Sequence, residues 1–261
     1  MNETAISLMM VNYNRAPYIA AAIDSVLNQT NKNWELIIID DGSNDGSQEI
    51  IKKYLSDARI KLIINPIRLG IVGTRIQAVQ ASRNEIIGVI DSDDVLDIKA
   101  VATMIQAHYA HQSGLIYSQM MICDEKLKPK TMANNRNIAP NSSNLIDNVI
   151  SHFFTFKKSV YLQTAGYNLF FNRCAEDKDL FYKLEEVTEP LFINEVLYYY
   201  RLNPSSVSNY GVKKIWGRVL YFSAKYQAYR RRLKNNSPKQ VKLWQILPGI
   251  NKIWTNKYLQ K

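Results

Sequence analysis

Acidic side chains cluster at two points in the first hundred residues of the chain. The sequence Asp-Asp-Gly-Ser at 40–43 directly follows one continuous apolar run, and Asp-Ser-Asp-Asp at 91–94 directly follows another. Such runs predict buried strands, and parallel sheets bind ligands outside the carboxyl ends of their strands. Because side chains alternate along an extended backbone, Asp91 and Asp93 converge on one point. Crowded carboxylates need a cation, so the pattern favours Mg²⁺ or Mn²⁺ bound to phosphate oxygens over solvated turns.

Two common phosphate-binding motifs are absent. The first predicted strand ends in Val11-Asn12-Tyr13-Asn14-Arg15, where a dinucleotide-binding fold would carry GxGxxG. The motif GxxxxGK[ST] occurs nowhere in the chain. The sequence therefore argues against a Rossmann dehydrogenase and against a P-loop hydrolase.

Strands and helices alternate regularly in the first half, which indicates an α/β fold with a mostly parallel central sheet. The apolar runs predict strands at 6–11, 36–39, 60–64 and 86–90, with helices between and after them at 17–27, 44–55, 71–81 and 98–111. This regularity ends after a further strand at 115–118.

The second half is less regular. Its polar stretch 126–148 predicts a loop or lid. Beyond it we expect strands at 153–156, 191–193 and 196–200, and helices at 159–165 and 177–187. We therefore expect a catalytic domain over 1–211, made of a nucleotide-binding half (1–118) and an acceptor-binding half (119–211), and a helical extension over 212–261.

The excess positive charge lies in that extension. The 261 residues carry 33 Lys and Arg against 23 Asp and Glu, a net charge of +10. Residues 212–261 contain 13 of the basic residues and no acidic residue, so the rest of the chain is slightly acidic. The extension also carries aromatic residues, including Trp216 and Trp254, which is typical of contact with an anionic membrane or a lipid-linked acceptor. Ordinary packing on the body is the alternative; no nucleic-acid motif accompanies the charge.

The cysteines and the N-terminus bear on the compartment. Two cysteines, Cys123 and Cys174, form neither a disulfide framework nor a zinc motif. The N-terminus carries an acid where an export signal would be basic, and no apolar run has the length of a membrane span. We expect a cytoplasmic protein, peripheral on the inner face of the membrane if the extension binds lipid.

Several motifs together resemble one enzyme family. These are Val-Asn-Tyr-Asn at 11–14, Ser-Val-Leu-Asn-Gln-Thr at 25–30, the run IIIDDGSNDGS at 37–47 and Asp-Ser-Asp-Asp at 91–94. In this combination the chain resembles the inverting family 2 glycosyltransferases of GT-A fold, over about residues 5–208.

The resemblance implies roles on the nucleotide side. Tyr13 would lie beneath the nucleotide base, and Asp41 would accept a hydrogen bond from the base ring. Arg75 matches a basic residue near the nucleotide, and Asp91 would lie near the ribose. Asp93 would bind the divalent metal on the diphosphate.

On the acceptor side, the resemblance implies that Asp177 of the Glu176-Asp177 pair is the general base. A base is required because the attacking hydroxyl loses its proton as it bonds to the anomeric carbon. A single base opposite the leaving group implies inversion, which gives a β-linked product from an α-linked donor. Acids also favour helix starts, so Glu176 and Asp177 have a structural interpretation as well. His152 would contact acceptor or diphosphate, or be structural.

Two positions depart from the family pattern. Asn203 stands where many members carry a histidine that reaches the metal or phosphate, and Ile76 stands where many carry an asparagine. The first departure predicts fewer protein ligands for the metal.

These observations predict a metal-dependent hexosyl- or N-acetylhexosaminyltransferase. It would use a nucleotide-sugar donor, with uridine diphosphate as the leaving group implied by the resemblance, and a hydroxyl of a growing surface glycan, free or lipid-linked, as acceptor. One alternative is a sugar-phosphate nucleotidyltransferase, which would need a glycine-rich basic loop after the first strand. The other is a non-catalytic basic module that binds membrane or nucleic acid.

Overall fold

The computed structural model describes residues 5–203, 212–235 and 241–246. Trp254 and the other tail residues beyond 246 therefore lie outside the described part of the chain. The strands are β1 (Ile6–Asn12), β2 (Trp34–Asp40), β3 (Ile60–Ile64), β4 (Ile86–Asp91), β5 (Val95–Leu96), β6 (Leu115–Cys123), β7 (Pro129–Met132), β8 (Phe154–Lys157) and β9 (Pro190–Arg201). The helices are α1 (Ile19–Leu27), α2 (Ser47–Lys52), α3 (Gly70–Ala81), α4 (Ala100–Ala110), α5 (Asn144–Asp147), α6 (Lys158–Leu162), α7 (Glu176–Glu185), α8 (Val212–Lys234) and α9 (Leu243–Ile246), with a 3-10 turn η1 (Leu169–Phe171).

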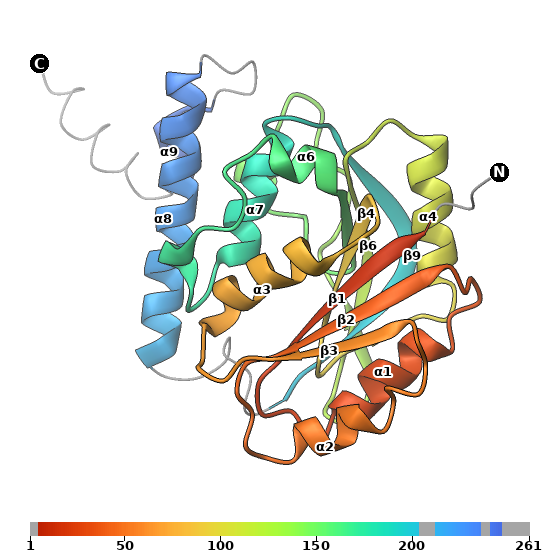
Figure 1. Ribbon diagram of the computed structural model, residues 1–261. Coiled ribbons are helices and arrows are strands. Elements are labelled where there is room, and N and C mark those ends of the chain that lie inside the picture. Colours follow the sequence, from red (N-terminus) through yellow and green to blue (C-terminus); the bar gives the residue numbers. More distant parts are fainter. Residues whose placement is uncertain (1–4, 204–211, 236–240, 247–261) are drawn as a thin grey trace, which may run out of the picture.

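The described strands form one mixed, mostly parallel sheet (Figure 1). Their order is β3-β2-β1-β4-β8-β6-β9-β5, and β7 pairs with β6 outside this path. Strands β1 to β4 pair in parallel, as do β6 and β9, whereas β8 runs antiparallel between β4 and β6. The predicted α/β class is confirmed, and the carboxyl ends of β1, β2 and β4 lie at one edge.

Alternation along the strands fills two cores. In β1, Leu8 and Met10 pack with α1 and α4 on one face, whereas Met9 packs with α3 and α7 on the other. Both faces are covered, so the middles of β1 and β2 are apolar at every position, as expected of a parallel sheet, and the buried polar pair Ser7 and Glu35 lies at their starts. This explains why the sequence shows short continuous apolar runs there.

The structure differs in three details from the sequence-based expectation. The stretch 126–148 is not all loop, because β7 pairs with β6 and residues 144–147 form α5. One strand, β9, replaces the two expected strands, with a register shift against β6 between Ser118 and Met120. The two-residue strand β5 follows Asp94 and pairs with β9. Short and bulged strands carry too weak a periodicity to be read from sequence.

The described part of the C-terminal extension packs on the body through one face. Ala224 and Ala228 of α8 are buried in a small core with Tyr182 of α7. Arg232 is 1 % exposed and pairs with Glu185 at 2.7 Å. Within the described residues, no helix is both long enough and apolar enough to cross a bilayer.

Candidate active site

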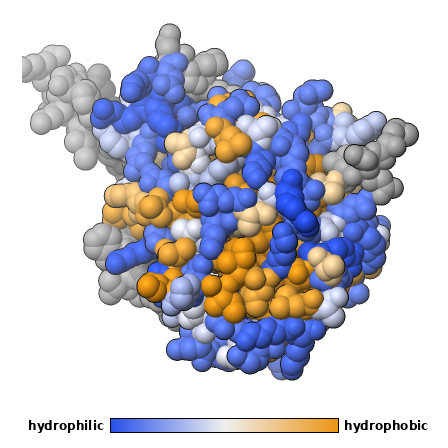
Figure 2. Space-filling model, viewed as in Figure 1, coloured by the Kyte–Doolittle hydropathy of each residue, from blue (hydrophilic) through white to orange (hydrophobic). Residues whose placement is uncertain are grey.

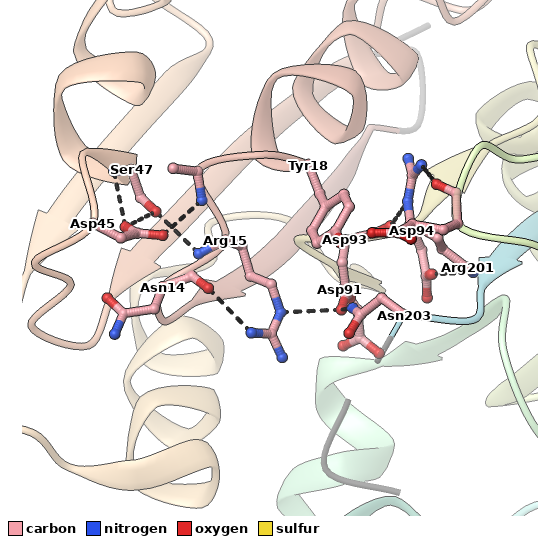
Figure 3. A network of polar contacts seen from close by, with 12 residues as sticks. Asn14, Arg15, Tyr18, Asp45, Ser47, Asp91, Asp93, Asp94, Arg201 and Asn203 are labelled. Atoms are coloured by element: carbon pink, nitrogen blue, oxygen red, sulfur yellow. Dashed lines mark hydrogen bonds and ion pairs between the residues drawn. The ribbon is translucent and has the colours of Figure 1, made fainter. Parts of the chain in front are cut away.

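The loop between β4 and β5 places the Asp91–Asp94 cluster at the carboxyl edge of the sheet (Figure 3). Asp94 is fully buried and anchors this loop to β9: it accepts hydrogen bonds from the Tyr198 hydroxyl at 2.8 Å and the Arg201 amide at 2.6 Å. The Arg201 Nε donates to the Asp93 carbonyl at 2.7 Å. Burial, together with the charges of Asp93 and Asp91, raises the pKa of Asp94 well above its usual range. Asp94 thus shapes the turn.

Asp93 faces two donors from distant segments. The Nε of Arg15 lies 3.0 Å from Asp93 Oδ2, and Asn203 Nδ2 lies 2.5 Å from the same oxygen. Two further hydrogen bonds position Arg15. Its backbone amide donates to Ser47 Oγ, and its Nη1 donates to the Asn14 carbonyl (Figure 3). Burial and the nearby Asp91 raise the pKa of Asp93. Asp93 is therefore a carboxylate whose charge is stabilised by added cations.

A second group of charges centres on Arg75. The helix α3 buries Val72, Arg75 and Val79, whose spacing directs all three toward the sheet, so this arginine lies beneath the site with a side chain only 3 % exposed. Its guanidinium contacts Asp177, and its Nη2 lies 3.3 Å from Asp91 Oδ1 and 3.5 Å from Glu176 Oε1.

The electrostatics of this group keep the arginine charged. Burial opposes the charge of Arg75, but the neighbouring Tyr167 and the carboxylates of Glu176 and Asp91 raise its pKa above the usual value. Burial raises the pKa of Glu176, and the charge of Arg75 opposes that rise. The start of α7 favours the two acids as well, because anions are stabilised at helix N-termini. The structure therefore brings together three carboxylates and one cation from β4, α3 and α7.

His152 closes this group from the side of β8. Its ring stacks on Tyr198 with centroids 5.1 Å apart, and its Nε2 lies 3.5 Å from Asp91 Oδ2 and 3.6 Å from Asp177 Oδ2. Burial lowers the pKa of His152 to about 4, so the imidazole is neutral at pH 7. His152 therefore lies beside these carboxylates as a neutral ring and adds no positive charge to the group.

Tyr13 and Asp41 lie together beside the start of α3. The guanidinium of Arg68 lies 3.6 Å from the centroid of the Tyr13 ring, and its Nε lies 3.7 Å from Asp41 Oδ2. Asp41 also accepts hydrogen bonds from the amides of Leu69 and Gly70, each at 2.8 Å. Asp41 thus orders the start of α3, which carries Arg75 one and a half turns later.

The residues fit one divalent cation held mainly by Asp93. The described residues contain no group of three or more His, Cys, Asp or Glu side chains arranged for a metal ion. Mg²⁺ usually takes one or two carboxylates and completes its shell with phosphate oxygens and water, which a single aspartate can serve. The two donors on Asp93, from Arg15 and Asn203, share Oδ2. Asp91 faces Arg75 and His152 instead, so its predicted metal role stays a prediction.

Comparison with known proteins decides the family. The sequence pattern described as glycosyl transferase family 2 matches residues 7–173. The chain belongs to this family. It is 31 % identical over 232 residues to the hyaluronan synthase of Pasteurella multocida, an alignment that covers 80 % of this chain and 22 % of that protein. The chain thus spans about a fifth of that relative.

Solved structures show that this family 2 chain has a GT-A transferase fold. The crystal structure of S. aureus TarS in complex with UDP-GlcNAc matches with a TM-score of 0.70 at 15 % identity, covering 97 % of this chain and 73 % of that one. The mannosyltransferase PcManGT of Pyrobaculum calidifontis, in complex with GDP-Man and Mn²⁺, matches with a TM-score of 0.67 at 14 % identity, covering 87 % and 65 %. At these identities the likeness establishes the fold.

Three site residues of this family 2 chain were not identified from sequence. Arg15 contacts Asp93, Arg68 covers Tyr13, and Tyr198 links Asp94 to the backbone of Asp91. Arg15 carried a signal, because it follows the first strand directly at the ligand-binding edge. Tyr198 lies in an aromatic run, which predicts core residues. Its second role, the link between Asp94 and the backbone of Asp91, is apparent only once β9 is paired in the sheet.

Proposed function

We propose that the chain is an inverting glycosyltransferase that moves a sugar from a nucleotide donor to a glycan hydroxyl. The observation that carries this proposal is the meeting of Asp177, from the second half of the chain, with Asp91, from the first half, around Arg75 and His152. We assign Asp177 to the acceptor hydroxyl and the loop with Asp91 and Asp93 to the donor nucleotide.

The donor side has a place for each part of a nucleotide sugar. We assign the base to Tyr13 and Asp41, the ribose to Asp91 and the diphosphate to Asp93 with Arg15. A ring for stacking, a carboxylate for the base NH and a cation for phosphate are the chemistry that a uridine nucleotide requires. The complex of TarS with UDP-GlcNAc supports a uridine diphosphate donor.

The proposed reaction is a single in-line displacement. Asp177 accepts the proton of the acceptor hydroxyl while the hydroxyl oxygen forms its bond to the anomeric carbon. The bond between that carbon and the diphosphate oxygen breaks, and its electron pair stays on the diphosphate. Arg75 and His152 contact Asp177 and orient it, and Arg15 faces the leaving oxygen. A divalent ion on Asp93, when bound, supplies Lewis-acid stabilisation of the same leaving group.

The acceptor we propose is a hydroxyl of a growing surface glycan, free or lipid-linked. The relationship to a hyaluronan synthase supports a polysaccharide product. Of the alternatives, the family assignment disfavours a sugar-phosphate nucleotidyltransferase, and the buried carboxylate group disfavours a purely basic binding module.

A donor screen tests the proposal. Purified protein is incubated with UDP- and GDP-sugars, with Mn²⁺ and with EDTA, and release of nucleoside diphosphate is measured. We expect turnover with one UDP-sugar in Mn²⁺ and its loss in Asp177→Asn, with binding of UDP retained by that variant. Full activity of Asp177→Asn would show that Asp177 is not the general base. If the protein neither binds nor turns over any nucleotide sugar, the proposal is wrong.

A further inference from the structure

The outward face of α8 is apolar and basic at the same time. An amphipathic surface helix usually buries its apolar face and shows polar residues to water. Here Ala224 and Ala228 already supply the buried face. Four further large apolar side chains remain exposed on α8, at 48 %, 37 %, 44 % and 45 %: Val219, Phe222, Tyr226 and Leu233.

These side chains form one stripe, which we call the outer stripe of α8. At 100° per residue, positions 219, 222, 226, 230 and 233 fall within about 80°, a little under a quarter of a turn. The exposed Arg230 lies within the stripe, and the exposed Arg218 and Lys234 flank it. Neither α8 nor any other part of residues 212–261 contains an acidic residue. The outer stripe therefore combines exposed apolar area with unopposed positive charge.

A cavity of about 1000 Å³ adjoins the C-terminal end of the outer stripe. Tyr226, Arg230, Leu233 and Lys234 of α8 line it, together with Leu169 of η1. Leu169 is 62 % exposed, and its neighbour Phe170 is 59 % exposed. The apolar rim thus continues from α8 onto η1, and in Figure 2 the flank of the molecule formed by α8 shows hydrophobic and hydrophilic side chains side by side.

Arg230 and Lys234, two basic side chains in the cavity lining, are available to an anion, whereas Lys183 and Arg231 are already paired. Lys183 pairs with Asp179 at 2.6 Å, and Arg231 pairs with Glu186 at 3.0 Å. Arg230, by contrast, contacts the Tyr226 hydroxyl, and neither Arg230 nor Lys234 forms an ion pair within the described residues. The cations that remain available are therefore those at the exposed, apolar end of α8.

We propose that the outer stripe of α8, with Leu169 and Phe170, is a surface that binds an anionic lipid bilayer. Apolar side chains interleaved with Arg and Lys are the composition that lies in the headgroup region, with apolar groups at the acyl boundary and cations near lipid phosphates. Charge complementarity selects an anionic bilayer over a neutral one. The proposal stands on α8 and η1 alone and does not require the proposed transfer reaction.

Vesicle co-sedimentation tests this surface. The full chain is mixed with vesicles of phosphatidylcholine alone and with vesicles that also contain phosphatidylglycerol. We expect binding to the second kind and not to the first, weakened by salt. Arg230→Gln/Lys234→Gln should lower the partition coefficient about 30-fold, since each basic side chain near an anionic surface contributes about fivefold. Phe222→Ser/Leu233→Ser should lower it at least about tenfold through lost apolar contact.

Matched controls separate this surface from general charge and from the tail. Lys52→Gln/Lys53→Gln removes two exposed charges at the C-terminal end of α2, and Tyr109→Ser removes an 83 % exposed aromatic from α4; neither should change binding. All variants should keep the thermal unfolding of the wild type, because the altered side chains are exposed. No binding of the wild type to either vesicle overturns the proposal. Equal binding of stripe variants and controls also overturns it, and would assign the affinity to net charge or to residues 247–261.

Discussion

Two arginines of the candidate site, Arg75 and Arg15, are paired with carboxylates in different ways. Arg75 has a side chain 3 % exposed and lies among the carboxylates of Asp91, Glu176 and Asp177. Arg15 is 18 % exposed and pairs with Asp93, itself 16 % exposed, at the open edge. A buried cation with three partners cannot leave without stranding charge, whereas a cation at the edge can exchange one anion for another. We infer that Arg75 is part of the fixed frame and Arg15 is the mobile charge.

The largest effect should come from substitution of Asp177 and Asp93, the aspartates that Arg75 and Arg15 contact. Asp177→Asn should lower kcat by about 10²–10⁴, the usual contribution of a general base, and leave the affinity for UDP nearly unchanged. Asp93→Asn should instead weaken UDP binding in the presence of Mn²⁺. Steady-state kinetics and calorimetry of both variants measure the split. An equal loss of kcat and UDP affinity in both would erase the distinction between the two regions.

Removal of the buried arginine should destabilise the fold. Arg75→Met leaves three carboxylates without their cation, and breaking a buried pair of this kind costs about 3–5 kcal/mol. Arg59→Met, which removes a more exposed arginine from Asp57, should cost less than about 1 kcal/mol. Urea unfolding of both variants measures these free energies. Similar values for the two would show that Arg75 is no more part of the frame than a surface pair.

Replacement of the edge arginine should change two affinities in opposite directions. Arg15→Gln should weaken binding of UDP in EDTA about tenfold, because a hydrogen bond from a charged donor contributes on the order of 1.5 kcal/mol. The same change should strengthen binding of Mn²⁺ without nucleotide, since Arg15 no longer competes for Asp93. Calorimetry and electron paramagnetic resonance read the two affinities. A fall in both would mean that Arg15 only shapes its loop.

The smallest effect concerns the neutral histidine beside the Arg75 group. Burial lowers the pKa of both His152 and His108 to about 4, against 6.5 for a free histidine. The unfolded chain therefore binds more protons between pH 6.5 and 4, so folding stability falls as the pH falls through that range. His152→Gln and His108→Gln should each reduce this loss, measured as Tm against pH. His152→Gln should also lower the rate of sugar transfer. His108→Gln is the control, because His108 is buried on α4 and its substitution should leave that rate unchanged.

Much of the fold was readable because the first half repeats one simple pattern. Strands such as β1 and β2 are buried on both faces, and each is followed by a helix, so short apolar runs mark them plainly. The expectation failed where pairing is local and irregular. Strand β7 is formed by four exposed residues, and β5 has only two, so neither has a periodicity of its own. The division into domains and the roles of the site residues stay predictions.

The amino-acid sequence was sufficient to predict the family, the parallel half-sheet and the strand ends that carry the acids, because these depend on local runs and on motifs a few residues long. It could not determine which charges meet. Arg15 contacts Asp93 across 78 positions and Arg75 contacts Asp177 across 102, and those contacts exist only once the strands are ordered in the sheet. The tertiary structure also decides that one apolar stripe of α8 stays exposed. Helical spacing indicates two apolar faces, but it does not indicate which of them packs on the body.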